Sequence, residues 1–290
     1  MTDSNTRRCA ITGSTGYLGS RVVRRFRSEG WHVLEMARSA SNSPSTIPYR
    51  LDSPLPLDAM EGLDTLIHCA YDFRATTPPA IQRTNGNGSV RLLKAAREIG
   101  VKTIIFISSM AAYDGCKSRY GSGKLAIERE AAKLDSVIVR PGMIYGKNAG
   151  GILASIRRAA SMLPVVPLIG DGRYPVFTVH EEDLCGLLFD VAMRRVQSPD
   201  CQPISAAARE TVPFRQMVTT LAAASGRKPF LLPIPWRIPF YGLRMIESLG
   251  LQPGFRSDSI LSLVEANPSP AFSPDESLQH RFRSFSVEDL

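Results

Sequence analysis

Three side chains in the middle of the chain have the types and spacing that hydride chemistry at a carbinol or carbonyl needs. Ser109 ends the apolar run FISS, and Tyr120 and Lys124 lie four residues apart in YGSGK. Residues four apart share one face of a helix, and a cation beside a phenol favours phenolate and lowers the phenol pKa. The three groups could therefore hold the substrate oxygen, move its proton and tune the acid. Taken alone, the Tyr120–Lys124 pair is more typical of a solvated helix face.

A glycine-rich stretch near the N-terminus predicts a nucleotide-binding turn. ITGSTGYLG places Gly13, Gly16 and Gly19 between a predicted strand and a predicted helix. At such a junction a dinucleotide pyrophosphate meets the N–H groups of the helix terminus. The alternative is a tight strand-to-helix junction without a ligand, which the surrounding strand and helix pattern disfavours.

The residues that follow the next predicted strand, HVLEMARSA, predict the choice of nicotinamide nucleotide. An acid about 20 residues after the glycines would hold the ribose hydroxyl of NAD, whereas an arginine accommodates the 2′-phosphate of NADP. Arg38 and Ser39 end this strand, and Glu35, the nearest acid, lies inside it. We therefore expect NADP(H) in preference to NAD, although Arg38 could also be a solvated charge at a strand end.

Strand-like and helix-like runs alternate through the first half of the chain and would position these groups. The strand-like runs are RCAIT, WHVLEMA, DTLIHCA, KTIIFISS and SVIVRPG, and the helix-like runs are SRVVRRFRSEG, SVRLLKAAREIG and KLAIEREAAKL. The alternation predicts an α/β fold, a Rossmann-type doubly wound parallel sheet. Prolines interrupt shorter helices from about Met162 onward, which indicates a less regular lobe. We expect a nucleotide-binding domain over 1–165, with 175–200 packing back onto it, and a smaller C-terminal substrate-binding lobe over 166–290.

Composition excludes several classes of function. The chain has 290 residues, of which 43% are hydrophobic and 21% charged, as in a folded globular protein. Its net charge of +8 is scattered without a Lys/Arg tract or an RNA-binding aromatic motif, so no nucleic-acid partner is expected. No apolar run approaches the roughly 18 residues of a membrane span, and no signal-peptide pattern opens the chain. We expect a cytoplasmic protein without an integral membrane segment.

The cysteines show neither CxxC pairing nor nearby histidines at the spacing of zinc ligands. They are Cys9, Cys69, Cys116, Cys185 and Cys201. We therefore expect reduced thiols and no metal site.

With these motifs, the chain resembles the short-chain dehydrogenase/reductase superfamily, specifically its extended, nucleotide-sugar epimerase/dehydratase type. The matching stretches are ITGSTGYLG, LIHCA, TNGNGSVRLLKAAREIGVKTIIFISS, YGSGK, VIVRPGMIYG, GDGRYPVFTVHEEDL, ETVPFRQMVTTLAAASGRKP and FRSFSVEDL. They span nearly the whole chain. The resemblance implies an NAD(P)-dependent enzyme acting on a hydroxyl or keto group of a small molecule, with Ser109, Tyr120 and Lys124 as its catalytic residues.

The resemblance also implies which residues contact the cofactor. They are Gly13, Gly16, Tyr17, Leu18, Gly19, Arg38, Ser39, Asp52, Asn85, Tyr120, Lys124, Pro141 and Gly142. Within this set Asn85 would touch the cofactor, Asp52 would reach toward the adenine, and Pro141–Gly142 would pass near the nicotinamide. Asp52, beside Ser53 and Pro54, is equally typical of a turn.

The departures from the family pattern narrow the reaction. Met110 and Ala111 stand where sugar dehydratases have an acid pair that eliminates water, so dehydration is not expected. Gly142–Met143 and Pro175–Val176 stand where epimerases have an asparagine and an arginine that serve the substrate. Both replacements weaken the expectation of a nucleotide-sugar substrate.

Two further features admit a structural and a functional interpretation. His180 follows an apolar strand and precedes a helix, where a capping or packed histidine is more common than a catalytic one. The stretch PIPWRIPFYGLRMIESLG has an aromatic, apolar face, which more often covers a substrate cleft than meets a membrane or partner.

Two hypotheses from different classes follow. The first is an NADP(H)-dependent oxidoreductase or epimerase that acts on a hydroxyl or keto group, with a nucleotide sugar as the expected substrate and net reduction favoured by the NADP preference. The second is a cofactor-binding sensor or assembly subunit that kept the fold without turnover. Retention of all three catalytic side chains favours the first. A homodimer is one expectation for the assembly, which the sequence leaves open.

Overall fold

The computed structural model describes residues 6–39, 45–147, 149–198, 202–251, 253–267, 269–273, 278 and 281–290. The chain divides into two compact units. Unit 1 comprises Met1–Ser109, Gly123–Arg140 and Leu184–Ile204, and unit 2 comprises Met110–Ser122, Pro141–Asp183 and Ser205–Leu290. The functional division expected at residue 165, with a substrate-binding lobe after it, stays a prediction.

The largest sheet of the described structure has seven strands in the order β11-β6-β5-β4-β1-β2-β3. Its strands are β1 (Arg8–Thr12), β2 (His32–Ala37), β3 (Thr46–Pro48), β4 (Thr65–His68), β5 (Thr103–Ile107), β6 (Val137–Pro141) and β11 (Ile204–Ala206). The pairs formed by β1 with β2 and β4, β2 with β3, β4 with β5, and β5 with β6 are parallel. The order reverses beside β1, and ligands of open α/β sheets bind at the carboxyl ends of the strands at such a point. The predicted Rossmann-type sheet is confirmed.

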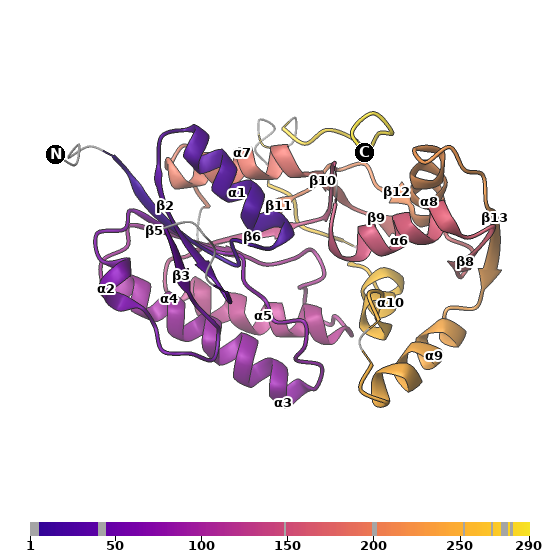
Figure 1. Cartoon of the computed structure of the whole chain (residues 1–290), viewed down its shortest axis with the longest axis horizontal. Helices are drawn as coiled ribbons and strands as arrows, with labels where there is room; N and C mark the ends of the chain where they lie inside the picture. Colours follow the sequence, from indigo (N-terminus) through magenta and orange to yellow (C-terminus); the bar gives the residue numbers. More distant parts are fainter. Residues whose placement is uncertain are drawn as a thin grey trace. The chain divides into compact units, whose positions relative to one another are not determined.

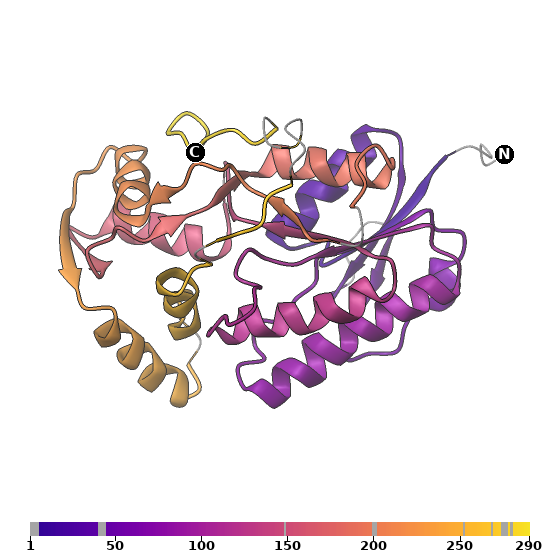
Figure 2. The same ribbon diagram turned by 180° about the vertical axis from the view of Figure 1, so that it is seen from behind.

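Helices cover both faces of this sheet (Figures 1 and 2). On one face lie α1 (Tyr17–Ser28) and α7 (Glu181–Ala192), and on the other lie α2 (Leu57–Met60), α3 (Pro78–Ile81), the π-helix η1 (Gln82–Asn87), α4 (Gly88–Glu98) and α5 (Arg119–Ala132). Phe26 of α1 packs edge-to-face on Phe189 of α7, with ring centroids 5.4 Å apart. Under α4 and α5, a buried cluster joins Leu92 and Ile127 to Phe106 of β5. The apolar stripes of the predicted helices are thus buried on the sheet.

Unit 2 is built from short, separate pairs of strands and from helices of 8 to 12 residues. Its strands are β7 (Met143–Tyr145), β8 (Val165–Ile169), β9 (Pro175–Val176), β10 (Thr178–His180), β12 (Val212–Pro213) and β13 (Phe230–Ile234), and its helices are α6 (Gly151–Met162), α8 (Phe214–Ala223), α9 (Arg237–Ser248) and α10 (Ser257–Val264). The strands form three two-stranded ladders, β7–β10, β8–β13 and β9–β12. Helix α6 packs on α8, and α9 packs on α10. The prolines expected to shorten the elements of this region stand inside or beside several of them.

Two global properties complete the description of the fold. Among the described helices, none has the length and apolarity needed to cross a membrane. Cys9, Cys69, Cys116 and Cys185 are free thiols, and Cys201 lies outside the described residues.

Candidate active site

The glycine turn connects β1 to α1, as the sequence predicts. Gly13 has a φ of +66°, which glycine adopts without strain, and its N–H donates to the carbonyl of Met36 at 2.8 Å. A Cβ on Gly19 would lie 2.1 Å from the carbonyl oxygen of Gly13, and one on Gly13 would lie 3.1 Å from the backbone of Ala70. The turn itself therefore requires Gly13 and Gly19. Gly16 has an ordinary φ of −75° and would bring a Cβ no closer than 3.1 Å to the Gly13 carbonyl.

The same turn fits a dinucleotide. The Ser14 hydroxyl oxygen is buried and has no hydrogen-bond partner among the described residues, and burying such a group without a partner costs free energy. Helix α1 starts at Tyr17, and Leu18 is its second residue. A helix N-terminus attracts anions through its N–H groups and dipole. An orphaned hydroxyl and a helix N-terminus beside a glycine turn that carries no side chains are what a pyrophosphate needs. Binding of the cofactor to Gly13, Gly16, Tyr17, Leu18 and Gly19 stays a prediction.

The acid nearest to the predicted ribose site, at the end of β2, is ion-paired within the protein. Glu35 lies inside β2, is 9% exposed, and accepts a hydrogen bond of 2.6 Å from Arg27 of α1. Arg38 and Ser39 follow the strand directly and are exposed. The position therefore offers a guanidinium group to a ligand, while the carboxylate that could repel a phosphate is ion-paired.

The loop after β4 holds an aspartate that the sequence did not single out. The side chain of Asn85 accepts the N–H of Asp72 at 2.7 Å and donates to the carbonyl of Asp72 at 3.1 Å. Arg74 donates to both carboxylate oxygens of Asp72, at 2.9 and 2.8 Å. The hydrogen bond from Arg74 is the main cause that lowers the pKa of Asp72, and the charge of Arg38 adds to it. Asn85 thus holds the backbone of this loop in place through its side-chain amide. A direct contact of Asn85 with a cofactor stays a prediction.

Asp52 lies in a turn. It is ion-paired with Arg50 at 3.5 Å, with more than half of its side chain exposed, and the N–H of Ser53 donates to the carbonyl of Arg50 at 3.0 Å. The turn-forming interpretation of Asp52 is confirmed. A contact of Asp52 with the adenine stays a prediction.

Lys124 is buried at the carboxyl end of β5. Its ammonium group donates to the carbonyl of Ile107 at 2.6 Å, and only 2% of the residue is exposed. The nitrogen lies 5.0 Å from the ring centroid of Tyr71 and 4.8 Å from that of Phe106. Burial lowers the pKa of Lys124 to about 8, because removing an ammonium from water disfavours its charged form.

A buried histidine links the ends of β1 and β4 to α4. Nδ1 of His68 lies 2.7 Å from the hydroxyl of Thr12, and Nε2 lies 2.8 Å from the hydroxyl of Ser89. The Thr12 hydroxyl also accepts the N–H of Ala70 at 3.1 Å. Burial, with the charge of Lys124 as a second cause, lowers the pKa of His68 to about 3, so the ring is neutral. The signal that could have identified this network is a single polar residue inside the apolar run LIHCA.

The first turn of α5, which carries Tyr120, is capped by two side chains. The hydroxyl of Ser118 accepts the N–H of Gly121 at 3.1 Å. The carboxylate of Asp258, from α10, accepts the N–H of Arg119 at 2.7 Å and that of Tyr120 at 2.9 Å. A carboxylate at a helix N-terminus also interacts favourably with the helix dipole. Asp258 was not predicted, because nothing in the sequence near Tyr120 points to it.

The structure places the predicted catalytic residues on adjacent elements in the chain. Ser109 comes two residues after β5 ends at Ile107, and Tyr120 and Lys124 lie one helical turn apart on α5. Ser109 and Lys124 belong to unit 1, and Tyr120 belongs to unit 2. Their convergence on one substrate atom stays a prediction.

Gly142, after β6, is required by close packing in unit 2. Its N–H donates to the carbonyl of Ala206 at 3.0 Å, and a Cβ would lie 2.6 Å from the carbonyl oxygen of Phe177. Val176, in β9, is 5% exposed. The two positions where epimerases carry an asparagine and an arginine therefore present no polar side chain here. The proximity of Pro141–Gly142 to a nicotinamide stays a prediction.

His180 has the structural role that the sequence favours. It ends β10 and is 6% exposed, its Nδ1 accepts the N–H of Glu182 at 3.3 Å, and its ring packs edge-to-face on Tyr145 with centroids 5.1 Å apart. It caps the start of α7 and packs in the interior.

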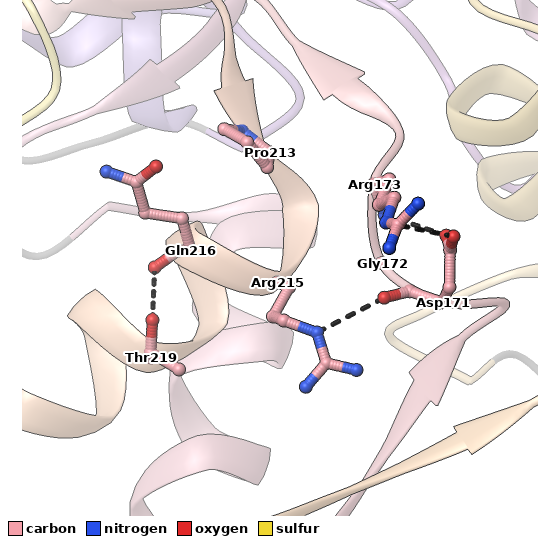
Figure 3. A pocket seen from close by; sticks show the side chains of 7 residues that line it. All are labelled: Asp171, Gly172, Arg173, Pro213, Arg215, Gln216 and Thr219. Atoms are coloured by element: carbon pink, nitrogen blue, oxygen red, sulfur yellow. Dashed lines mark hydrogen bonds and ion pairs between the residues drawn. The ribbon is translucent and has the colours of Figure 1, made fainter.

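Unit 2 contains an open cavity of about 600 Å³ at the start of α8 (Figure 3). It is lined by Asp171, Gly172, Arg173, Pro213, Arg215, Gln216 and Thr219. Arg215 donates to the carbonyl of Asp171 at 3.2 Å, and Arg173 pairs with the Asp171 carboxylate at 3.4 Å. None of the predicted catalytic or cofactor-binding residues lines this cavity.

Comparison with known proteins places the chain in a family. The model of the NAD-dependent epimerase/dehydratase family matches residues 9–200, a span that includes the glycine turn, Ser109, Tyr120 and Lys124. The chain belongs to this family. It is an enzyme of the extended short-chain dehydrogenase/reductase type that depends on a pyridine nucleotide.

Relatives that resemble this chain are named for different activities. The chain is 30% identical over 236 residues to a ceramide reductase of Caulobacter vibrioides, covering 78% of this chain and 73% of the relative. It is 26% identical over 272 residues to a UDP-glucose 4-epimerase of Vibrio cholerae, covering 80% of each. It also matches 29% of the length of a longer uncharacterized protein of Mycobacterium tuberculosis, at 29% identity over 282 residues. MoeE5, solved in complex with UDP-glucose and NAD, shares the fold with a TM-score of 0.69 at 23% identity, covering 80% of this chain and 86% of MoeE5.

Proposed function

We propose that this enzyme is an NADP(H)-dependent oxidoreductase whose net reaction is the reduction of a keto group to a hydroxyl. The observation that carries the proposal is Lys124. Its ammonium is buried at the carboxyl end of β5, one turn of α5 beyond Tyr120, and Ser109 follows the same strand. A buried cation at the ligand-binding edge of the sheet, one helical turn after a phenol and on the helix that follows a strand-end hydroxyl, suits proton transfer to a carbonyl oxygen.

Each of the three side chains has a distinct role in this proposal. Tyr120 donates the proton to the substrate oxygen, and Ser109 holds that oxygen by a hydrogen bond. Lys124 stabilises the phenolate that remains on Tyr120 and binds the nicotinamide ribose. The bound nicotinamide nucleotide supplies the hydride. The main-chain carbonyl of Ile107, which accepts from Lys124, sets the position of the ammonium.

The preference for NADP(H) rests on the end of β2. Arg38 is exposed there, and Glu35 is bound to Arg27. A guanidinium pairs with a phosphate through charge-assisted hydrogen bonds, so a 2′-phosphate gains a contact that a 2′-hydroxyl lacks.

For the substrate we propose a ketone on a long-chain lipid in place of the nucleotide sugar expected from the resemblance. Gly142 has no space for a side chain, and Val176 is buried, so neither supplies the polar contact that nucleotide-sugar epimerases have at these positions. The similarity to a ceramide reductase over 78% of the chain supports a lipid. A UDP-sugar is the second candidate, supported by the similarity to a UDP-glucose 4-epimerase.

A coupled assay tests the proposed function. Purified protein with NADPH would be mixed with keto-ceramide analogues in detergent micelles, with UDP-4-keto-sugars, or with UDP-glucose. Oxidation of NADPH would be followed by its absorbance, and the sugar products would be identified. We expect NADPH oxidation with the lipid ketone and formation of the corresponding alcohol. Turnover of UDP-glucose to UDP-galactose without net nucleotide oxidation would replace the reductase proposal with an epimerase.

A further inference from the structure

Helix α9 has two different faces in unit 2. Its inner face carries Phe240, which is 9% exposed, and Glu247, whose carboxylate accepts the N–H and the hydroxyl of Ser257 at 2.8 and 2.7 Å. These contacts hold α9 against the start of α10, its neighbour in Figures 1 and 2. The inner face thus has the packing and the hydrogen bonds of an ordinary helix contact.

The outer face of α9 is apolar and exposed. Ile238, Tyr241, Met245 and Leu249 recur at spacings of three and four residues, which places them along one side of the helix. Their exposed fractions are 63%, 62%, 71% and 76%. Leu251, just beyond the helix, is 60% exposed. Scattered exposed apolar residues are normal, but a continuous apolar stripe on a helix indicates a surface that binds something.

The charges around this stripe have one sign. Arg237 and Arg244, seven residues apart, lie on the same flank of α9, and Arg227 and Lys228 precede it in the chain; all four are exposed. The one acid between residues 227 and 251 is Glu247, which is bound to Ser257 on the inner face. An apolar stripe whose own segment exposes cations and no acid suits a partner that is apolar inside and anionic at its surface.

We propose that the outer face of α9 docks on an anionic lipid bilayer, with the helix lying in the plane of the membrane surface. Its stripe would enter the acyl boundary and Arg237 and Arg244 would meet lipid phosphates, as in other interfacial amphipathic helices. Tyr241, on the outer face of the helix, is a residue type that favours the membrane interface. A helix of 12 residues is about 18 Å long and lies on a bilayer without crossing it.

A second copy of this chain is the less suitable occupant. A two-fold interface would place the same face of both copies together and oppose Arg237 and Arg244 of one copy to those of the other, with no exposed acid in the segment to compensate. Anionic lipid neutralises the same charges. The docking does not require that the enzyme's substrate be a lipid, so it is tested without cofactor or substrate.

The test is flotation of the purified full chain with two kinds of vesicle, one of phosphatidylcholine and one that contains phosphatidylglycerol. We expect the protein to float with the anionic vesicles at least about tenfold more strongly than with the neutral ones. Met245→Glu should reduce this binding by about tenfold or more, because it places a carboxylate on the stripe. Val287→Glu, at an exposed apolar residue elsewhere in unit 2, is the matched control and should bind as the unaltered protein does.

A second pair of variants separates local charge from net charge. Removing both arginines with Arg237→Gln and Arg244→Gln should weaken binding by about fivefold for each. Removing two exposed arginines of unit 1 with Arg24→Gln and Arg83→Gln changes the net charge equally and should have a much smaller effect. Equal loss in the two double variants would show non-specific attraction and overturn the docking site.

Tryptophan fluorescence identifies the segment that meets the lipid. The chain has 2 tryptophans, and Trp236 packs on Phe240 of the inner face with ring centroids 5.8 Å apart. In a triple variant with Trp31→Phe, Trp236→Phe and Tyr241→Trp, the emission therefore comes from position 241 on the outer face alone and should shift to the blue on addition of anionic vesicles. Absence of vesicle binding by the unaltered protein, or full binding by a folded Met245→Glu, would overturn the proposal. Self-association that Met245→Glu abolishes, without vesicle binding, would assign the face to a second copy instead.

Discussion

The ammonium of Lys124 donates to the main-chain carbonyl of Ile107 at 2.6 Å, which fixes a buried charge at the end of β5. Burial lowers the pKa of Lys124 from 10.5 to about 8. Between these two values the unfolded chain holds a proton that the folded chain has released, so the free energy of unfolding increases with pH in this window. Below the folded pKa both states are charged, and the full desolvation penalty remains.

Lys124→Met should therefore change how stability depends on pH. Relative to the unaltered protein, the variant should be most stabilised near about pH 7 and should lose that advantage as the pH approaches about 10. Urea unfolding across this range measures the difference. Lys133→Met, at a largely exposed lysine just after α5, is the control and should leave the pH dependence unaltered. An identical pH dependence in both variants would show that Lys124 titrates normally.

Tyr120→Phe should lower the rate of keto reduction by about 10²–10⁴-fold, the usual contribution of general acid catalysis. Affinity for NADPH should stay nearly unchanged, because only the proton donor is lost. Reduction by the unaltered enzyme should slow at high pH as the phenol loses its proton. The pH–rate profile of the variant should lack this decrease. Single-turnover rates and NADPH titrations measure both quantities, and full activity in Tyr120→Phe would remove the proposed catalytic role of Tyr120.

Arg38→Ala should weaken NADPH binding by about 1.5–3 kcal/mol, the range for a hydrogen bond to a charged group. NADH binding should change little, because NADH has no 2′-phosphate. Dissociation constants for both nucleotides, measured for the variant and the unaltered protein, give the result. Arg83→Ala, at another exposed arginine of unit 1, is the control. An unaltered protein that binds NADH as well as NADPH would contradict the proposed cofactor preference.

Gly16→Val and Gly19→Ala should have different effects. Gly16 has an ordinary φ, and its Cβ position is close only to the Gly13 carbonyl at 3.1 Å, so Gly16→Val should fold and lose nucleotide binding. Gly19→Ala would bring a Cβ to 2.1 Å from the same oxygen and should destabilise the fold itself. Thermal unfolding and NADPH titration separate the two results. If folded Gly16→Val binds NADPH normally, the glycine turn has a structural role and does not bind the cofactor.

Asp258→Ala should destabilise the protein by about 0.5–2 kcal/mol, the range for loss of a helix cap. The variant leaves the N–H groups of Arg119 and Tyr120 without their acceptor, so the turnover number should fall while NADPH affinity is retained. Asp258→Asn retains an acceptor oxygen and should recover part of both effects. Chemical unfolding and steady-state kinetics measure them, and a fall in stability without a fall in turnover would restrict Asp258 to a structural role.

The sequence by itself determined the sheet, the helices of unit 1 and the place of each chemical motif on them. The period of apolar residues and the steric demands of a tight turn act between neighbours in the chain, so the strand RCAIT, the turn at Gly13 and the helix that carries Tyr120 and Lys124 were all predictable. The prediction that Arg38 follows a strand, with Glu35 inside it, was confirmed for the same reason.

Only the tertiary structure decided how the polar groups are paired. Lys124 bonds to a carbonyl 17 residues away, and Asp258 caps the helix of Tyr120 from 138 residues further along the chain. Asn85 holds the backbone of Asp72, and α9 keeps an apolar face exposed. These relationships depend on which distant surfaces meet when the chain packs, and a local pattern of residue types does not encode that choice.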